Sequence, residues 1–253
     1  MAYFTVTAVF TVAPLQSSPL TATDIQGLFD RIAPVYDSLN ERLSFGLHRV
    51  WKRMAVRWSG AAPGQTALDV CCGSGDMALM LAQAVGTTGK VYGLDFSAEL
   101  LAVAEGRSRR APLPTQPHWV QGDALALPFE ASTFDAATMG YGLRNLTDIP
   151  QGLTELHRVL KPGATAAILD FHRPQGWLAE QFQRWYLDAL VVPAAEQMGL
   201  TEEYAYIGPS VDRFPDGPEQ VALARRAGFG QAVHYPIAGE LMGVLVVGRH
   251  DRV

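Results

Sequence analysis

The chain has 253 residues, of which 48% are hydrophobic and 18% charged, enough for one large domain with a sizeable core. Its formal net charge of −5 argues against broad nucleic-acid binding. The local cluster of Arg107, Arg109 and Arg110 is better explained as the solvated end of a helix. Because its two cysteines, Cys71 and Cys72, are adjacent, neither a disulfide framework nor a zinc site is expected, and no metal is predicted.

The first 20 residues are apolar with interspersed threonines and contain no lysine or arginine. A secretory signal needs a positive amino-terminal region and a transit peptide needs arginine, so neither is predicted. The apolar run stops at Pro14, too short to span a bilayer as a helix. We expect residues 1–20 to form a poorly ordered extension of unknown role, residues 21–253 a single domain, and the protein to be cytoplasmic.

Helices are predicted first, over residues 24–58, where apolar side chains recur at helical spacing on both sides of Pro34. After a turn at Pro63 and Gly64, strands and helices alternate. We expect strands over 67–71, near 91, near 118, over 135–139 and over 164–170, and helices from 76, over 98–107 and over 150–160. This alternation predicts an α/β fold with a mostly parallel sheet and a ligand at the carboxyl ends of its strands.

An aromatic segment interrupts the alternation over about 173–218, and we expect a helical insertion there that ends in a Pro-, Gly- and Asp-rich loop over 208–218. Its aromatic side chains would form either the core of a cap or the wall of an apolar substrate cavity. Two closing strands follow, over 231–235 and 241–248, for which an antiparallel hairpin is the expected arrangement.

The stretch Leu68–Asp76 ends a predicted strand in a Gly73-x-Gly75 turn. Glycines there permit positive φ angles and let a ligand approach the main chain closely, and the following helix would point unpaired amides at the turn. Asp95 follows 20 positions after Gly75 at the end of the next strand, the usual place for a carboxylate that accepts from ribose hydroxyls. The pattern therefore predicts a nucleotide-sized cofactor.

The same turn also fits a dinucleotide, so two further features decide between cofactors. Asp69 and Asp76 bracket the turn and would repel a pyrophosphate, whereas a cationic cofactor would be favoured. Asp123 ends a third strand, where it could accept from an adenine amino group. Asp69, Asp95 and Asp123 around a Gly-x-Gly turn are typical of S-adenosylmethionine-dependent methyltransferases, although each aspartate alone could simply cap a helix.

Two further segments carry information about the acceptor: Tyr36–Trp51 and Gly140–Asp148. Together with Arg158–Gly163, they make the chain resemble the ubiquinone/menaquinone biosynthesis C-methyltransferase family over about residues 25–250. Departures from the family pattern occur at four positions, namely Leu39, Ala164, Asp170 and His172. The Cys-Cys-Gly-Ser-Gly turn and Met139–Arg144 are most similar to the cyanobacterial and plastid branch, whose members methylate a phytyl-bearing naphthoquinol.

The resemblance implies a Rossmann-like class I methyltransferase with a mostly parallel, twisted, seven-stranded sheet, helices on both faces and an N-terminal helical cap. It implies S-adenosyl-L-methionine as the cofactor. The expected cofactor-binding residues are Asp69, Gly73, Ser74, Gly75, Asp95, Phe96, Asp123, Ala124 and Gly140, with Asp69 orienting the turn.

A reduced quinol ring must be close to deprotonated before its carbon can attack a sulfonium methyl group, so a base and an oxyanion stabiliser are required. We expect Arg144 and Asn145 to hold the oxyanion, with Arg144 organising a water, and Tyr36 to relay a proton or orient the ring. His48 is interpreted as a packing residue. His172 is either a base or a bystander.

The predicted function is therefore methylation of a reduced prenylated naphthoquinol, demethylphylloquinol or demethylmenaquinol, in the final step of phylloquinone or menaquinone biosynthesis. The alternatives are a methyltransferase acting on another benzoquinol or lipophilic phenol, a nucleotide-linked oxidoreductase, and a catalytically dead scaffold. Expected partners are the prenylated quinol and, through the aromatic insertion or helix 25–57, a thylakoid or plasma membrane surface. No nucleic acid is expected, and the oligomeric state is left open, with a homodimer as one alternative.

Overall fold

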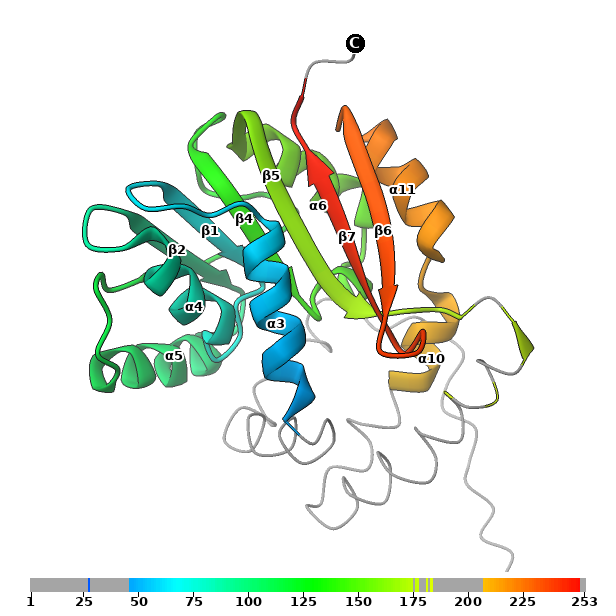
Figure 1. Ribbon diagram of the computed structural model, residues 1–253, viewed down its shortest axis with the longest axis horizontal. Helices are drawn as coiled ribbons and strands as arrows, with labels where there is room; N and C mark the ends of the chain where they lie inside the picture. Colours follow the sequence, from blue (N-terminus) through cyan, green and yellow to red (C-terminus); the bar gives the residue numbers. More distant parts are fainter. Residues whose placement is uncertain are drawn as a thin grey trace, which may run out of the picture.

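The fold is a three-layer α/β sandwich built on one sheet (Figure 1). The computed structural model describes residues 27, 46–174, 176–177, 181, 183 and 207–250. Its strands run in the order β3-β2-β1-β4-β5-β7-β6. Their bounds are β1 Thr66–Val70, β2 Lys90–Asp95, β3 His118–Gln121, β4 Phe134–Gly140, β5 Leu160–Phe171, β6 Gln231–Ile237 and β7 Met242–Gly248.

Strands β1 to β5 pair in parallel, whereas β7 pairs antiparallel with both β5 and β6. The predicted mostly parallel, seven-stranded sheet and the closing antiparallel hairpin are thereby confirmed. The strand order reverses between β1 and β4, since the chain moves outward through β2 and β3 before it returns to β4. In open α/β sheets, ligands bind at such a reversal, outside the carboxyl ends of the strands.

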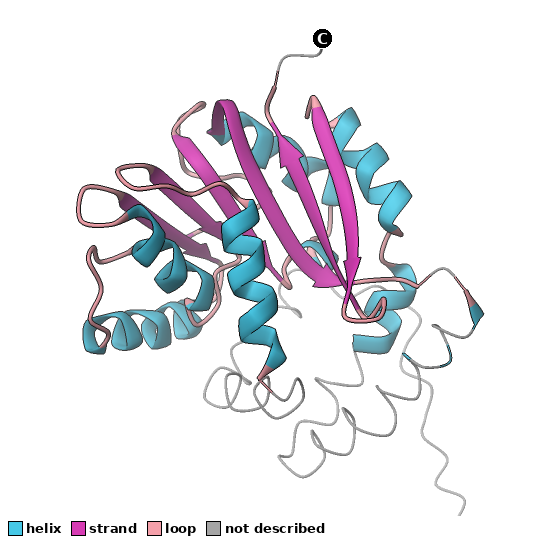
Figure 2. Cartoon of the chain, in the orientation of Figure 1, coloured by secondary structure: helices cyan, strands magenta, loops and turns pink. Residues whose placement is uncertain are grey.

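Helices cover both faces of the sheet (Figure 2). Alternation within β1 explains this, because Ala67 joins a core with α3 and α4, while Leu68 and Val70 join a second core with α6 and α11. The helices are α3 Leu47–Trp58, α4 Asp76–Val85, α5 Ala98–Arg110, α6 Ile149–Val159, α10 Ile207–Arg213 and α11 Gly217–Arg226, with a 3₁₀ helix, η1, over Leu143–Asn145.

The prediction of a loop over 208–218 is wrong. Helix α10 occupies residues 207–213, where Pro209 is tolerated because it falls in the first turn. Helix α11 was not predicted, although the sequence contains its start signal: Asp216 and Glu219 form a reciprocal capping box. Of the predicted N-terminal helices, the described part is α3, which lies across the sheet, and most of the insertion over 173–218 lies outside the described residues. No helix within the described part of the chain is long and apolar enough to cross a membrane.

Candidate active site

A cavity opens at the carboxyl ends of β1, β2, β3 and β4, where the strand order reverses. Four connections supply its walls: the turn after β1, the β2–α5 junction, the segment after β3 and the β4–α6 loop. The lining residues are Cys71, Gly73, Leu94, Asp95, Phe96, Leu100, Gly122, Asp123, Ala124, Leu125, Gly140, Tyr141, Gly142, Asn145, Leu146 and Thr147. The cavity thus lies where the parallel sheet predicts a ligand site.

The two glycines of the turn after β1 are needed for different reasons. Both have positive φ angles, +53° for Gly73 and +90° for Gly75. A Cβ on Gly75 would lie 2.7 Å from the indole of Trp119 and 3.0 Å from the Ala104 methyl group, so Gly75 permits tight packing. A Cβ on Gly73 would meet no atom within 4 Å, and Gly73 lines the cavity. Gly73 therefore leaves the main chain open to a ligand.

Asp95 connects the turn to the end of β2. One carboxylate oxygen accepts from the Gly73 amide at 2.7 Å and the other accepts from the Ser97 amide at 3.0 Å. The side chain lines the cavity although its residue is only 3% exposed. Since an ionised carboxylate can accept about four hydrogen bonds, it retains capacity for ligand hydroxyls.

Asp123 and Ala124 form the wall contributed after β3. The Asp123 carboxylate accepts from the Leu125 amide at 2.8 Å, and this bond fixes the exposed side chain at the cavity rim. Ala124 is buried beside it. Both residues line the cavity, as predicted for cofactor contacts.

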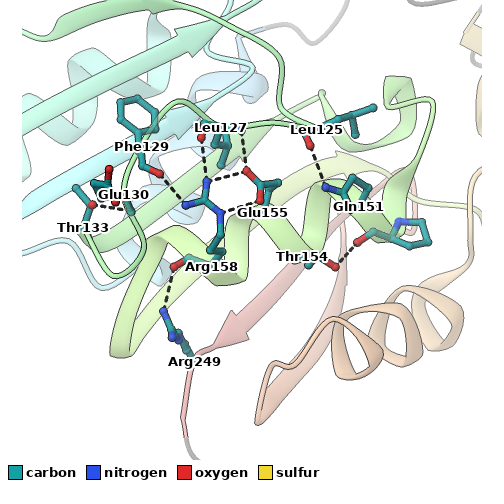
Figure 3. Close-up of polar contacts among 11 residues, drawn as sticks. Leu125, Leu127, Phe129, Glu130, Thr133, Gln151, Thr154, Glu155, Arg158 and Arg249 are labelled. Atoms are coloured by element: carbon teal, nitrogen blue, oxygen red, sulfur yellow. Dashed lines mark hydrogen bonds and ion pairs between the residues drawn. The ribbon is translucent and has the colours of Figure 1, made fainter.

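The segment after Asp123 is attached to α6 by charged side chains (Figure 3). Arg158 donates to the carbonyl oxygens of Leu127 and Phe129, at 2.9 and 2.7 Å, and also pairs with Glu155. Glu155 in turn accepts from the Leu127 amide at 2.8 Å. Arg158, which carried part of the family resemblance, therefore holds this wall of the cavity in place.

Asp69, Ser74 and Gly75 were predicted as cofactor residues, but the structure does not bring them to the cavity wall. Asp69 is 1% exposed and accepts from the Thr138 hydroxyl at 2.8 Å. Burial raises the pKa of its carboxyl to about 7. Ser74 is also buried and accepts from Arg107 at its hydroxyl oxygen and at its carbonyl oxygen. These residues support the turn from behind.

The electrostatic argument for a cationic cofactor also needs correction. The Asp76 carboxylate is paired with Lys52 of α3 and with Arg107 of α5, so its charge is neutralised locally. Although burial acts to raise it, these two cations hold the pKa of Asp76 well below its ordinary value. Arg107 is likewise not part of a solvated helix end, and neither Lys52 nor Arg107 was recognised as part of the site from the sequence.

The β4–α6 loop turns sharply over the cavity at Tyr141, whose φ angle is +60°. Its carbonyl oxygen accepts from the Asn145 amide nitrogen at 3.0 Å and from the Arg144 guanidinium at 2.9 Å. Arg144 also pairs with Asp170 at 2.7 Å and lies over the Phe171 ring. Arg144 is thus engaged with β5 and does not line the cavity, whereas Asn145 and Tyr141 do.

Asn145 presents an open acceptor at this wall. Its amide nitrogen is used by Tyr141, but within the described part of the chain its buried Oδ1 has no hydrogen-bond partner. A buried acceptor without a partner is costly unless a ligand satisfies it. The free group is therefore an acceptor, not the donor predicted for oxyanion binding.

The turns after β1 and β4 touch each other through Cys71 and Gly142. A Cβ on Gly142 would lie 2.6 Å from the Cys71 Cβ, so only glycine fits there. Burial, followed by the charge of Asp95, raises the pKa of both cysteine thiols. Cys71 and Cys72 are free but are not nucleophilic thiolates.

The remaining candidates lie elsewhere. His48 is buried in α3, in accord with a packing role, and the Asp148 carboxylate caps α6 by accepting from the Gln151 amide. His172 lies with its ring centroid 5.0 Å from that of His234, in a separate cavity beside α11. Burial lowers the pKa of His172, which does not line the first cavity. Tyr36 lies outside the described residues.

The first cavity fits S-adenosylmethionine, with the open turn at Gly73, a hydroxyl acceptor at Asp95 and a second carboxylate at Asp123. Of the predicted cofactor residues, those at the wall are Gly73, Asp95, Phe96, Asp123, Ala124 and Gly140. Reasoning from the sequence missed the wall residues Leu100, Gly122 and Tyr141. For Gly122, the strand end just before Asp123 was an available signal.

Comparisons with known proteins agree. Residues 18–247 match the model of the ubiE/COQ5 methyltransferase family. A Synechocystis protein named 2-phytyl-1,4-naphtoquinone methyltransferase is 64% identical over 228 residues, covering 89% of this chain and 95% of that protein. The Arabidopsis thaliana protein named 2-phytyl-1,4-beta-naphthoquinone methyltransferase, chloroplastic, is 50% identical over 88% of this chain and 86% of that protein.

Solved structures agree on the fold. A SAM-dependent methyltransferase from Thermotoga maritima superposes with a TM-score of 0.62 at 18% identity, covering 89% of this chain and 99% of that one. One from Aquifex aeolicus superposes with a TM-score of 0.57 at 21% identity, covering 78% and 88%.

Fold and site together define a Rossmann-like, S-adenosylmethionine-dependent methyltransferase. Within that class, the chain belongs to the ubiE/COQ5 methyltransferase family, which matches it over residues 18–247. The family resemblance drawn from the sequence is confirmed.

Proposed function

We propose that this protein methylates a ring carbon of a reduced, prenylated naphthoquinol, in the final step of phylloquinone or menaquinone biosynthesis. One observation carries the proposal: relatives from cyanobacteria and a plant, 50% to 64% identical over almost nine tenths of the chain, are named as methyltransferases of 2-phytyl-1,4-naphthoquinone. The apolar character of much of the cavity wall, with Leu94, Leu125 and Leu146, suits such an acceptor.

When bound, S-adenosylmethionine supplies an electrophilic methyl group, which replaces the hydrogen on the ring carbon while one proton leaves to solvent and a thioether remains. The residues that would hold it are Gly73, Asp95, Phe96, Asp123, Ala124 and Gly140. The acceptor must be the reduced ring, because the oxidised quinone is too poor in electrons to be a nucleophile. The task of the protein is therefore to orient a quinol and to favour loss of its hydroxyl proton.

Asn145 is proposed as the residue that orients the quinol. Its unpartnered Oδ1 lies at the cavity wall, where a quinol hydroxyl could donate to it. The hydrogen bond from its amide nitrogen to the Tyr141 carbonyl fixes the direction in which that oxygen points. Asn145 would thus align the hydroxyl next to the reacting carbon.

Arg144 is proposed to act by positioning. Its guanidinium binds the Tyr141 carbonyl and Asp170, and it therefore holds the loop that carries Asn145. Its fixed positive charge would also favour a deprotonated quinol close by. The proton relay assigned to Tyr36 stays a proposal.

The test is transfer of a labelled methyl group from S-adenosylmethionine to demethylated quinols that carry a phytyl tail, a polyisoprenyl tail or no tail. We expect transfer to reduced naphthoquinols and the fastest turnover with phytyl. Labelling of only the oxidised quinones would contradict the proposed nucleophile, and faster labelling of a benzoquinol or a simple phenol would favour those acceptors. Binding of NADH but not of S-adenosylhomocysteine, measured by calorimetry, would instead indicate an oxidoreductase.

A further inference from the structure

Helix α3 has a charge opposite to that of the molecule as a whole. The chain carries a net charge of −5, yet the 12 residues Leu47–Trp58 contain three arginines, one lysine and no acidic residue. A helix so basic in an acidic protein has a local preference for anionic partners.

The cations of α3 are divided between its two faces. Lys52 belongs to the inner face, with His48, Ala55 and Val56, and it pairs with Asp76. The arginines recur every fourth residue along the exposed side of the helix, at Arg49, Arg53 and Arg57. The basic row therefore faces outward and is not consumed by the inner face.

An apolar stripe runs beside the arginine row, at helical spacing, and consists of Leu47, Val50, Trp51, Met54 and Trp58. Leu47 is 50% exposed and Val50 is 54% exposed, in the first turn, while the other three are half-buried. Further along, the Trp58 ring packs against Tyr235 of β6, with centroids 5.0 Å apart. The stripe is thus most open at the start of the helix.

The open end of α3 lies at the carboxyl edge of the sheet. Lys52, near the middle of the helix, reaches Asp76 just after the β1 turn and lies 5.7 Å from the centre of the Tyr141 ring after β4. The first turn of α3 precedes this point and extends toward the edge at which the cavity opens (Figure 1). An apolar and basic surface therefore lies on the same side of the molecule as the active site.

We propose that the outer face of α3, with its arginine row and apolar stripe, docks on an anionic lipid membrane. Exposed leucine, valine and tryptophan beside a row of arginines is the arrangement of helices that lie in the membrane interface. The arginines face lipid phosphates, and Leu47 and Val50 enter the headgroup region. This docking rests on the helix itself and not on the identity of the acceptor, although a lipophilic quinol would reach the enzyme by that route.

The test is flotation of the whole protein with vesicles, without any quinol. The protein should float with vesicles of phosphatidylcholine mixed with phosphatidylglycerol, bind vesicles of phosphatidylcholine alone much less, and be released by high salt. The double variant R53Q/R57Q should weaken binding on the order of tenfold or more, because each arginine near an anionic surface contributes to attraction. The variant L47S/V50S should also bind more weakly while keeping its dependence on salt.

R109Q/R110Q is the matched control, since it removes two exposed cations from the last turn of α5 with the same change in net charge. It should float like the wild type. Circular dichroism and methyl transfer to a quinol without a tail should show that the α3 variants remain folded and active. Equal flotation of R53Q/R57Q and wild type, or failure of the wild type to float, would overturn the proposal. So would tight binding of an RNA duplex that the same variants abolish, which would make nucleic acid the partner.

Discussion

Asp69 is a carboxylate placed where water does not reach. It lies one residue before the end of β1, is 1% exposed and has the Thr138 hydroxyl as a donor. Burial raises the pKa of its carboxyl from 3.8 to about 7, more than Thr138 and the charge of Lys52 lower it. In the unfolded chain the same group would lose its proton near its ordinary value, so folding and protonation of Asp69 are linked.

Asp69→Asn should therefore change how stability depends on pH. Between about pH 4 and 7 the folded wild type binds a proton that the unfolded chain has lost, so its free energy of unfolding falls relative to the variant as the pH rises. The full difference is on the order of 4 kcal/mol, at about 1.4 kcal/mol for each pKa unit, and it is constant above pH 7. Asparagine retains an acceptor for Thr138, so urea unfolding of both proteins over this range measures the difference.

Asp135→Asn is the control for Asp69. Burial alone would raise the pKa of Asp135, but Lys161 and the Thr66 amide lower it, so its linkage lies below its ordinary value. The difference between that variant and wild type should be constant between about pH 5 and 8. If the Asp69→Asn difference were equally constant, Asp69 would be ionised in the folded protein.

Asn145→Ala should lower turnover without weakening cofactor binding. The substitution removes the open Oδ1 acceptor at the cavity wall, which we propose orients the quinol. Loss of one hydrogen bond to a bound hydroxyl costs about 1 to 3 kcal/mol, or roughly tenfold to a hundredfold in kcat/KM. Methyl transfer measures the loss, while calorimetry with S-adenosylhomocysteine should give an unchanged Kd. An equal loss in cofactor binding would place Asn145 in the cofactor site.

At the level of elements, Asp76 joins three helices. It starts α4 and pairs with Lys52 of α3 and with Arg107 of α5. Arg107 also donates to the carbonyl and hydroxyl oxygens of Ser74, at 2.8 and 3.0 Å. The cofactor turn is therefore held from behind by a charged network that is mostly buried, and loss of one partner in such a network leaves another charge unpaired.

Arg107→Gln should loosen the cofactor turn. We expect the KM for S-adenosylmethionine to rise several-fold, the kcat at saturating cofactor to stay near the wild-type value, and the free energy of unfolding to fall by about 1 to 3 kcal/mol. The control is Arg109→Gln, two residues along, whose side chain is 72% exposed and pairs with Glu105. A fall in kcat with an unchanged KM would place the effect of Arg107 at the acceptor and not at the turn.

The elements that sequence reasoning predicted well are those whose signals are local. The alternation of β1 to β5 with α4, α5 and α6 followed from apolar runs bounded by turn residues, and so did the closing hairpin. Helix α10 was mistaken for a loop because Pro209 was taken as a breaker, although proline is tolerated in a first turn. Local signals such as the capping box of α11 were present and simply not used.

Within the site, the sequence predicted which loops meet but not which side chains face the ligand. Asp69 and Asp95 each come near the end of a strand, yet Asp69 points into the layer of α3 and α4 while Asp95 reaches the cavity. The pairing of Asp76 with Lys52 and Arg107 joins positions 24 and 31 apart. No local pattern indicates such long-range contacts, since they arise from packing of whole helices.

At the level of the whole molecule, the active-site cavity belongs to one half of the sheet. Its wall comes from the connections that follow β1, β2, β3 and β4, and none of its residues comes from β6, β7 or α11. The other half, with the antiparallel hairpin and α11, forms a second cavity around His172 and His234. A ligand in the first cavity would therefore stabilise four loops and leave the far half of the sheet unchanged.

Hydrogen exchange with and without S-adenosylhomocysteine tests this division. Binding to the folded state alone adds about 2.7 kcal/mol at a hundredfold excess over Kd, which for a chain of this size raises the Tm by roughly 5 to 10 °C. In exchange measured under native conditions, the amides of 71–76, 94–97, 122–125 and 140–147 should gain protection, because their local opening becomes linked to ligand release. Those of 231–248 should exchange as before. Asp95→Asn, which replaces an anionic acceptor with a neutral amide, should reduce both effects together. Protection that appeared in 231–248 and spared the four loops would place the cofactor beside His172 and His234, and the site assigned to Gly73 and Asp95 would then be wrong.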